Sequence, residues 1–570
     1  MKKITSLCFY AAIASRAMAY DFSYNGFFFN FNNPEHTTVE LAGVDQSYSS
    51  VISLRDIPPS IPVAPNSYYE VTGIGDYAFM GYHEDESHEA IAWLPQTITY
   101  IGHMAFSECN LQYIDIPHSV QYIGSAAFQG CNNLTGITIP ENVEYINEYT
   151  FADCTSLSCV ELPSTLKAIG RYAFKNSGLC MFKPVFNDSE DELYTIPQNI
   201  TAIEEGTFQG CSSLNRLRIP PSIKTIASDA FIDCRLKELN IVDSNEPLIF
   251  NFNKSSETAF VRVGFQDCLL SYAYIGRDIQ IDLNDSEMSA CFLHNGFFSF
   301  SSSPELGAYP KVEFGSNVTT IPNYLFKNSS VTEVTLSENI TKIGDYTFEN
   351  CIELQDINLH DGITEIGIGA FTNCYLANLH IPSQLTKIEY STFSGCGGFS
   401  TLEIPENVTS IAPYAFSNCF NVTNIIIPSS VNEIGSYALF GMNLSTVIST
   451  SKTPPAIQED TFHESAYNAT LKIPTGSIRA YQAHPHWSNF FNIVEQPIET
   501  EVKDVENLRP QFAVTSEGIC FLNDFDNVNI YSSEGLIVYS GKIAHGKTVK
   551  VAMGHMYLLK IGSKIYKVMP

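Results

Sequence analysis

Nine cysteines at one fixed place in a repeated pattern are the residues of this chain best suited to chemistry. A cysteine thiolate can bind a metal, form a disulfide or act as a nucleophile. Each of the nine follows a phenylalanine by three residues, and they are Cys109, Cys131, Cys154, Cys211, Cys234, Cys351, Cys374, Cys396 and Cys419. Residues in one register of a stacked repeat point the same way, so we expect a ladder of buried, free thiols rather than a disulfide framework. The chain has no C-x-x-C pair, which argues against a zinc site.

The sequence offers little else for catalysis. It contains no H-E-x-x-H, G-x-S-x-G or P-loop motif. The segment His83-EDESH combines acids with two histidines and could hold a cation weakly, although a solvated loop is the simpler interpretation. We therefore expect no enzyme activity, no catalytic residue, no cofactor and no metal, and we keep a hydrolase site in residues 244–310 as an alternative.

A repeat of about 23 residues must position these side chains. Its frame is L-x-x-I-x-I-P-x-x-V-x-x-I-G-x-x-A-F-x-x-C, as in Leu134 to Cys154. In L-x-x-I-x-I the aliphatic residues alternate with polar ones, which predicts a strand with one buried face. The proline ends that strand because it has no N–H to donate. One coil cannot bury its Ile and Phe side chains alone, so the coils must stack into a solenoid.

The repeat phenylalanines set the register of this stack. They recur mostly at steps of 22 or 23 residues, with three longer steps, and Leu439 takes the next place after Phe416. The series is Phe79, Phe106, Phe128, Phe151, Phe174, Phe208, Phe231, Phe326, Phe348, Phe371, Phe393 and Phe416. We expect each ring to pack on the ring of the next coil.

The frame resembles the BspA-like leucine-rich repeats of bacterial surface proteins, also called the Treponema pallidum type. The motif I-P-x-x-V-x-x-I-G-x-x-A-F-x-x-C carries the resemblance, which covers roughly residues 70–450. Asp21-FSYNGFFFN, Tyr274-IGRDI and Leu471-KIPTGSIRAY are similar to segments that accompany such repeats in Bacteroidetes proteins. The resemblance implies surface display and binding of host proteins, other cells or glycans, and it supplies no catalytic residues.

The predicted fold is mainly β: a leucine-rich-repeat solenoid of about 23-residue coils, followed by a small C-terminal antiparallel β domain. The last 60 residues are similar to a small β-sandwich found at the C terminus of exported Bacteroidetes proteins. The predicted segments are a signal peptide at 1–19, an N-terminal β cap at 20–70, a first repeat block at 71–243, irregular solenoid coils at 244–310, a second repeat block at 311–449, a C-terminal cap at 450–495, a linker at 496–509 and the C-terminal β domain at 510–570. In the C-terminal cap we expect a short helix at Ser477 to Ala483, with Trp487, Phe490 and Phe491 covering the open end of the stack.

The N-terminal segment predicts export. Lys2 and Lys3 precede an apolar stretch, and Ala17-Met18-Ala19 is a small-x-small cleavage signal. No later window carries 18 uncharged apolar residues, so we expect no transmembrane segment and a location outside the cell or at its surface, associated with the outer membrane. The formal net charge of −30 excludes nucleic acid as a partner, which leaves host or microbial surface proteins or glycans.

The polar positions of the first strand are the candidate binding site. The third and fifth residues of L-x-x-I-x-I face outward, and stacking would tile them over one continuous concave sheet. These residues are Tyr113, Asp115, Arg216, Arg218, Glu333, Thr335, Asp356, Asn358, Asn378, His380, Thr401 and Glu403. A merely solvated face, on a stalk without a ligand, is the alternative. The aromatic group Phe292, Phe297, Phe298 and Phe300 is a rival site, although core filling explains it better.

Overall fold

The computed structural model describes most of the chain as two compact units, Met1–Gln496 and Pro497–Pro570. The described residues are 20–45, 54–83, 91–184, 195–252, 264–283, 287–288, 296–300, 310–496, 512–515, 518–521, 525–532, 537–543, 547–551, 557–561 and 564–568. The predicted signal peptide, the acid-rich segment after His83, Phe292 and residues 497–509 of the predicted linker lie outside them.

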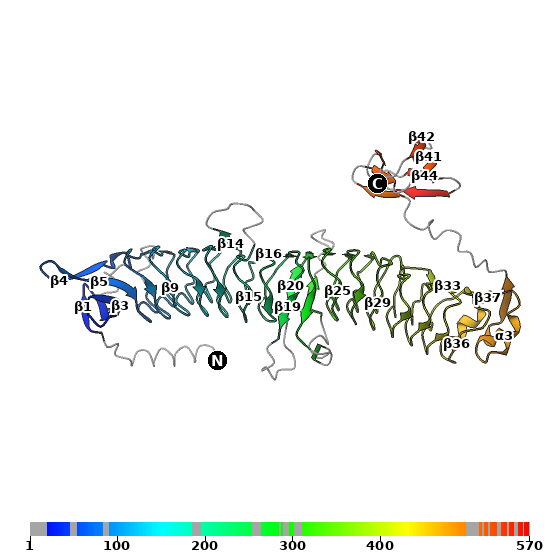
Figure 1. Cartoon of the computed structure of the whole chain (residues 1–570), viewed down its shortest axis with the longest axis horizontal. Helices are drawn as coiled ribbons and strands as arrows, with labels where there is room; N and C mark the ends of the chain where they lie inside the picture. Colours follow the sequence, from blue (N-terminus) through cyan, green and yellow to red (C-terminus); the bar gives the residue numbers. More distant parts are fainter. Residues whose placement is uncertain are drawn as a thin grey trace. The chain divides into compact units, whose positions relative to one another are not determined.

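The first unit is a row of stacked coils (Figure 1). Each regular coil contributes one strand from the L-x-x-I-x-I half of the repeat, and we call these strands the first-strand series. Its members are β6 (Ile91–Trp93), β8 (Tyr113–Asp115), β10 (Gly136–Thr138), β12 (Cys159–Leu162), β14 (Met181–Pro184), β16 (Arg216–Ile219), β18 (Glu238–Ile241), β21 (Tyr272–Ile275), β24 (Lys311–Phe314), β26 (Glu333–Thr335), β28 (Asp356–Ile357), β31 (Thr401–Glu403), β33 (Asn424–Ile427), β35 (Thr446–Ser449), β37 (Thr470–Pro474) and β38 (Asn492–Gln496). Within each sheet of the series neighbouring members pair in parallel, so equivalent residues of successive coils lie side by side.

The other half of each coil contributes a shorter strand at V-x-x-I-G. This second-strand series also pairs in parallel, for example Ile343 with Ile366. Its members are β7 (Tyr100–Ile101), β9 (Tyr122–Ile123), β11 (Tyr145–Ile146), β13 (Ala168–Ile169), β15 (Ala202–Ile203), β17 (Thr225–Ala227), β19 (Leu248–Asn251), β22 (Ile279–Ile281), β25 (Thr320–Ile321), β27 (Lys342–Ile343), β29 (Glu365–Ile366), β30 (Lys387–Ile388), β32 (Ser410–Ile411), β34 (Glu433–Ile434) and β36 (Ala456–Ile457). Together the two series give the mainly β solenoid that the repeat predicts.

A turn around each repeat phenylalanine supplies a third set of contacts between coils. In the coil of Phe348, the residues two places before and after it are left-handed, with φ of 54° at Tyr346 and 59° at Asn350. The N–H groups of these three residues donate to carbonyl oxygens of the next coil at 2.7 to 2.8 Å. A left-handed residue other than glycine costs roughly 1–2 kcal/mol. The hydrogen bonds to the next coil offset that cost, so the conformation depends on stacking.

The repeat phenylalanines form an unbroken aromatic stack, as the register predicts. Neighbouring rings from Phe79 to Phe416 lie with centroids 5.1 to 5.8 Å apart. Phe265 and Phe298 fill the long interval between Phe231 and Phe326, where the sequence frame is lost. Phe297 and Phe300 are buried as well, which confirms core filling for the three described members of this aromatic group.

The repeat cysteines form the predicted ladder of free, buried thiols. Each Sγ donates to the carbonyl oxygen of the repeat phenylalanine in the preceding coil, at 2.7 to 3.2 Å. Burial raises the pKa of Cys351 and of Cys419 to about 12, so these sulfurs remain protonated and weakly nucleophilic. Buried Ser177 and Ser329 take the same place in two coils that lack the cysteine. The thiols are therefore structural hydrogen-bond donors.

The irregular coils stay in register partly through a buried arginine that the sequence analysis missed. In regular coils an asparagine donates to the turn after the preceding first strand, as Asn407 Nδ2 does to the Ser383 carbonyl at 2.8 Å. The turn at residues 220–223 has Arg277 instead, from two coils further on. Its guanidinium donates to the carbonyls of Pro220 at 3.0 Å and Ile223 at 2.8 Å. Arg277 is fully buried, and burial lowers its pKa. Two strands, β20 (Phe265–Leu270) and β23 (Phe298–Phe300), complete this region.

Strands and short helices close the two ends of the stack. At the N-terminal end, β1, β2 and β3 pair antiparallel, and β3 then pairs in parallel with β5, which leads into the second-strand series. These elements are β1 (Phe22–Tyr24), β2 (Phe27–Phe31), β3 (Thr38–Val44), the 3-10 helix η2 (Leu54–Asp56), β4 (Ser60–Ala64) and β5 (Ser67–Ile74). The C-terminal end has the 3-10 helix η5 (Glu464–Asn468), α3 (Ile478–Ala483) and the 3-10 helix η6 (Trp487–Asn489).

The predicted short helix of the C-terminal cap is confirmed as α3, and Trp487 and Phe490 are buried as expected. The expectation for Phe491 is wrong, because this side chain is 82% exposed. Phe490 and Phe491 are consecutive residues leading into β38, and neighbouring residues of an extended segment point to opposite sides. Only one of the two rings can therefore cover the end of the stack.

The second unit has two antiparallel sheets, in the orders β39-β40-β43 and β42-β41-β44-β45. The strands are β39 (Phe512–Thr515), β40 (Gly518–Phe521), β41 (Phe525–Ser532), β42 (Ile537–Ile543), β43 (Thr548–Val549), β44 (Tyr557–Ile561) and β45 (Lys564–Val568). Buried Phe521 from the first sheet and Ile530 from the second belong to one apolar cluster. The antiparallel character is as predicted, and the sandwich arrangement stays a prediction.

The expectation of one continuous sheet along the first strands is wrong. The first-strand series forms four hydrogen-bonded sheets, in the orders β6-β8, β10-β12-β14, β16-β18-β21-β24-β26-β28 and β31-β33-β35-β37-β38. The last break falls on the coil of Asn378 and His380, in which residues 376–381 form no strand. In the coil before it, Asn358 bonds to Leu336 through its side-chain amide, and the backbone pairing with β26 ends at Ile357.

Replacing Phe371 with alanine tests the aromatic stack. The ring is fully buried, with neighbouring ring centroids at 5.3 and 5.5 Å. The cavity left behind should lower the free energy of unfolding by about 3–5 kcal/mol, measured by urea unfolding followed with circular dichroism. Phe420→Ala is the matched control, because that ring is 58% exposed and should change stability by less than about 0.5 kcal/mol. A loss below about 1 kcal/mol for Phe371→Ala would contradict the stack as the source of stability.

Candidate binding surface

The outward side chains of the first-strand series and of its equivalent coil at residues 376–381 form one face, which we call the strand face. Alternation positions them: Ile114 is buried, while Tyr113 and Asp115 on either side of it are exposed. All twelve predicted site residues lie on the outside of the solenoid, with Arg218 and Glu333 half-buried and the others exposed. Because successive coils pair in register, the third and fifth positions form two columns along the stack.

Ion pairs between neighbouring coils occupy part of this face. Arg216 Nε lies 2.9 Å from Glu238 Oε2. Lys311 Nζ lies 2.7 Å from Glu333 Oε1 and 3.1 Å from Glu313 Oε1. Exposed pairs of this kind contribute about 0–1 kcal/mol, so they order the side chains more than they stabilise the fold. Two predicted site residues, Arg216 and Glu333, therefore already have partners within the chain.

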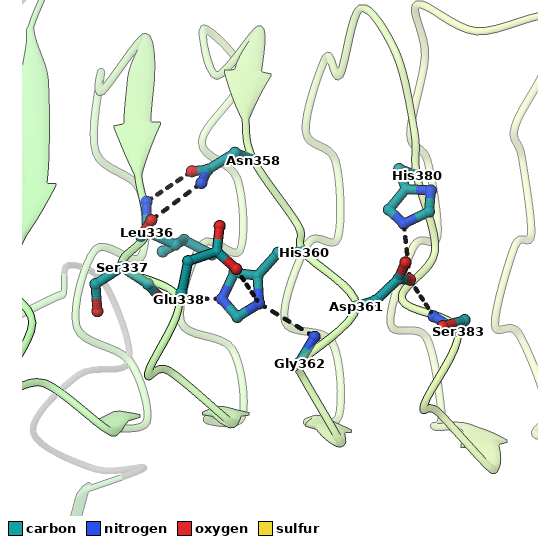
Figure 2. Close-up of polar contacts among 9 residues, drawn as sticks. All are labelled: Leu336, Ser337, Glu338, Asn358, His360, Asp361, Gly362, His380 and Ser383. Atoms are coloured by element: carbon teal, nitrogen blue, oxygen red, sulfur yellow. Dashed lines mark hydrogen bonds and ion pairs between the residues drawn. The ribbon is translucent and has the colours of Figure 1, made fainter. Parts of the chain in front are cut away.

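Side chains near the break in the first-strand sheets connect coils to one another (Figure 2). Asn358 Oδ1 accepts from the Leu336 N–H at 2.7 Å, and its Nδ2 donates to the Leu336 carbonyl at 3.0 Å. His360 Nε2 lies 3.0 Å from the Ser337 carbonyl, while its Nδ1 accepts from the Gly362 N–H at 3.2 Å. A neutral imidazole protonated at Nε2 satisfies both contacts of His360. Asn358 thus takes part in the fold rather than standing free for a ligand.

His380 is also tied into the fold. Its Nε2 lies 3.1 Å from Asp361 Oδ1 in the preceding coil, and the same oxygen accepts from the Ser383 N–H at 2.7 Å (Figure 2). Partial burial acts to raise the pKa of Asp361, but the hydrogen bonds from Ser383 and His380 outweigh it and hold that pKa below its ordinary value. The arrangement replaces missing strand pairing between these two coils with a side-chain bridge.

A hollow of about 420 Å³ lies on the second-strand side, next to the irregular coils. Its lining includes the carboxylates Glu204, Glu205 and Asp229. Asp229 stands two places before Phe231, where most other coils have a left-handed residue, but its own φ is not positive. Burial, together with the charge of Glu205, raises the pKa of Asp229, against the lowering effect of the Gly206 N–H. Tyr172 donates a hydrogen bond to Glu205 and the Gly206 N–H donates one to Asp229, so two of the three carboxylates are already engaged within the fold.

Trp93 is one of the strand-face residues that the sequence analysis missed. Trp93 lies on β6, in register with Asp115 on β8, and is 59% exposed. The segment Ile91-AWLP matches the Tyr113-IDIP segment of the next coil if Pro95 is aligned with Pro117. The proline register was therefore the signal that could have placed Trp93 on this face.

Comparison with known proteins settles the family of the repeats. The sequence model described as BspA type leucine rich repeat region (6 copies) matches residues 65–180, 180–258, 296–398, 342–469 and 388–506, which span more than half of the chain. The chain belongs to the BspA-type leucine-rich repeat family. The resemblance seen in the sequence is thereby confirmed, and the Bacteroidetes origin stays a prediction.

Solved leucine-rich repeat proteins are similar to parts of this BspA-type chain. One from Bacteroides ovatus is 23% identical, with 75% of this chain and 94% of that one covered and a TM-score of 0.39. A leucine-rich repeat protein of T. pallidum is 22% identical, covering 37% and 88%, with a TM-score of 0.29. A leucine rich cell surface protein of Faecalibacterium prausnitzii is 21% identical, covering 74% and 94%, with a TM-score of 0.30. No curated protein matches the chain.

Two further observations on the BspA-type solenoid concern metal binding and membrane-spanning helices. Among the residues that the structure describes, no three His, Cys, Asp or Glu side chains are grouped so that they could hold a metal ion. The same residues contain no helix with the length and apolar character needed to cross a membrane.

Replacing Asp361 with asparagine tests the side-chain bridge. A carboxyl whose folded pKa is depressed contributes stability above its unfolded pKa, and this contribution is lost as the pH falls through the folded pKa. Asp361→Asn should therefore lower the melting temperature at about pH 6, and the difference from the parent should shrink as the pH approaches about 2. Glu338→Gln is the control, because Glu338 lies 3.6 Å from His360 and its side chain is 84% exposed. Equal melting temperatures for parent and Asp361→Asn at about pH 6 would refute the bridge.

Proposed function

We propose that this chain is an exported surface protein that binds host proteins, other cells or glycans through the strand face, without catalysing a reaction. The observation that carries the proposal is the contrast between the two sides of the first strands. The inward positions are uniformly apolar, as with Ile114, Leu217 and Val334. The outward positions change chemical character from coil to coil, from tyrosine through arginine, glutamate and threonine. Folding requires only the inward pattern, so the outward pattern is available for recognition.

The polar contacts within the chain reduce the set of predicted residues that are free to bind a ligand. Arg216 and Glu333 are in ion pairs, and Asn358 and His380 connect coils. The remaining predicted residues have no side-chain hydrogen bond or ion pair with another residue of the described chain, and they are Tyr113, Asp115, Arg218, Thr335, Asp356, Asn378, Thr401 and Glu403. A rigid frame that holds such side chains in place loses little conformational entropy on binding, which favours affinity.

Composition and family also support a surface binding role. The net charge of −30 disfavours nucleic acid and anionic lipid as partners. The predicted N-terminal export signal and membership of the BspA-type family favour display outside the cell. The repeat cysteines do not suggest catalysis, because their thiols are protonated and buried.

A fourfold substitution on the strand face tests the proposal. The variant replaces Arg218, Thr335, Asp356 and Glu403 with alanine in residues 20–496. It should no longer bind those members of an extracellular-matrix protein panel and a glycan array that the parent binds. The melting temperature should stay unchanged, because these side chains make no polar contact with the described fold.

The matched control carries the same charge change on the outward side of other segments, at Glu148, Lys224, Thr386 and Glu433, which are exposed. This variant should bind as the parent does. If both variants bind like the parent, the strand face is not the recognition surface. If the parent binds nothing on either panel and self-associates in light scattering, a structural stalk replaces the binding proposal.

A further inference from the structure

The N-terminal end of the strand face carries two exposed aromatic rings on neighbouring strands. Trp93 on β6 is 59% exposed and Tyr113 on β8 is 47% exposed. The only other tryptophan of the chain, Trp487, is fully buried and donates to the Pro455 carbonyl at 2.9 Å. Exposed aromatic side chains of this size are a common mark of recognition sites.

Strand pairing places polar groups beside these rings. Trp93 is in register with Asp115 on β8, and Thr138 on β10 pairs with Glu161 on β12. By the repeat, Gly136 takes the place next to Tyr113, and a side chain at Gly136 would meet only the Cys159 carbonyl, at 3.6 Å. With strands about 4.8 Å apart, the missing side chain leaves a shallow step flanked by an aromatic ring and two carboxylates. We call Trp93, Tyr113, Asp115, Gly136, Thr138 and Glu161 the aromatic patch.

Within the aromatic patch, Thr138 Oγ1 donates to Glu161 Oε2 at 2.7 Å, whereas the two rings and Asp115 are not engaged in this way. Elsewhere Arg216, Lys311 and His380 have partners in neighbouring coils. Within the described part of the chain, neither Trp93 nor Tyr113 packs against another aromatic ring. The Asp115 carboxylate likewise has no hydrogen-bond or ion-pair partner among the described residues. The rings and this carboxylate are therefore available to a ligand.

The size and charge of the aromatic patch indicate which class of ligand it suits. Six residues are far fewer than the roughly 20–30 per side of a stable protein interface. Flat rings suit the apolar face of a pyranose, and carboxylates accept hydrogen bonds from its hydroxyls. Asp115 and Glu161, on a chain of net charge −30, repel uronates and sulfates. We propose that the aromatic patch binds a neutral glycan chain, an inference that rests on the proposed binding role of the strand face.

Tryptophan fluorescence gives a direct test, because Trp93 is exposed and Trp487 is not. Residues 20–496 are titrated with neutral hexasaccharides of α-glucan, β-glucan, β-mannan and β-xylan, and with a hexamer of galacturonate as the anionic probe. At least one neutral hexasaccharide should shift the emission to shorter wavelength and protect Trp93 from acrylamide quenching. The galacturonate hexamer should do neither.

Variants then locate the site by calorimetry with the hexasaccharide that binds. Trp93→Ala and Tyr113→Ala should each weaken binding roughly tenfold or more, the loss expected for an aromatic anchor. Trp93→Phe, which keeps a ring, should weaken binding less than Trp93→Ala. Phe420→Ala is the matched control, because that ring is 58% exposed and lies outside the patch, and it should bind as the parent does.

Three results would overturn the assignment: no neutral hexasaccharide protects Trp93, the two alanine variants bind like the parent, or galacturonate binds more tightly than the neutral probes. Failure of this inference is distinguishable from failure of the proposed function. If the matrix-panel binding of the parent survives in Trp93→Ala and Tyr113→Ala but is lost in the fourfold variant, the strand face binds and the glycan assignment alone is wrong.

Discussion

Each coil is joined to the next chiefly by the turn that surrounds its repeat phenylalanine. The ring packs on the rings of both neighbouring coils, and the two left-handed residues around it aim three N–H groups at the next coil. The cysteine three places later donates to the phenylalanine carbonyl of the coil before. Apolar packing and hydrogen bonding thus converge on one residue. A coil in isolation would have neither, since its left-handed residues would cost free energy without the bonds that offset them.

This constraint explains how the solenoid tolerates its irregular coils. Between Phe231 and Phe326 the strands lengthen and the leucine frame disappears, yet Phe265 and Phe298 keep the ring spacing at 5.1 to 5.6 Å. Arg277 supplies the donor that an asparagine supplies elsewhere. Its desolvation is costly, and the carbonyls of Pro220, Pro221 and Ile223 offset part of that cost by accepting hydrogen bonds from the guanidinium. The aromatic stack is therefore the feature that cannot be interrupted, while the turn chemistry can be replaced.

The sequence predicts what the repeat spacing determines and misses what depends on contacts between distant coils. Alternation and register predict the strands, the phenylalanine stack and the buried thiols, because these follow from local periodicity. Phe265 and Phe298 escape notice because they follow the preceding ring by 34 and 33 residues instead of 22 or 23, although Cys268 follows Phe265 by three residues as in the frame. Arg277 escapes because its partners are more than fifty positions away. The same limit applies to the candidate site: alternation identifies which side chains face outward, but only the structure shows that Asn358 and His380 are engaged with neighbouring coils.

These contacts give the outward side chains of the strand face different roles in different coils. Where backbone pairing is interrupted, near Asn358 and His380, outward side chains are used to hold coils together. Between β6 and β8 the backbone joins the two coils at three residue pairs, so the outward side chains of these two strands are not required for that role. Trp93 and Tyr113 stand on this pair of strands, which forms a two-stranded sheet of its own. Recognition is thus best supported where the backbone alone supplies the connection, because a side chain cannot both fix its neighbouring coil and adapt to a ligand.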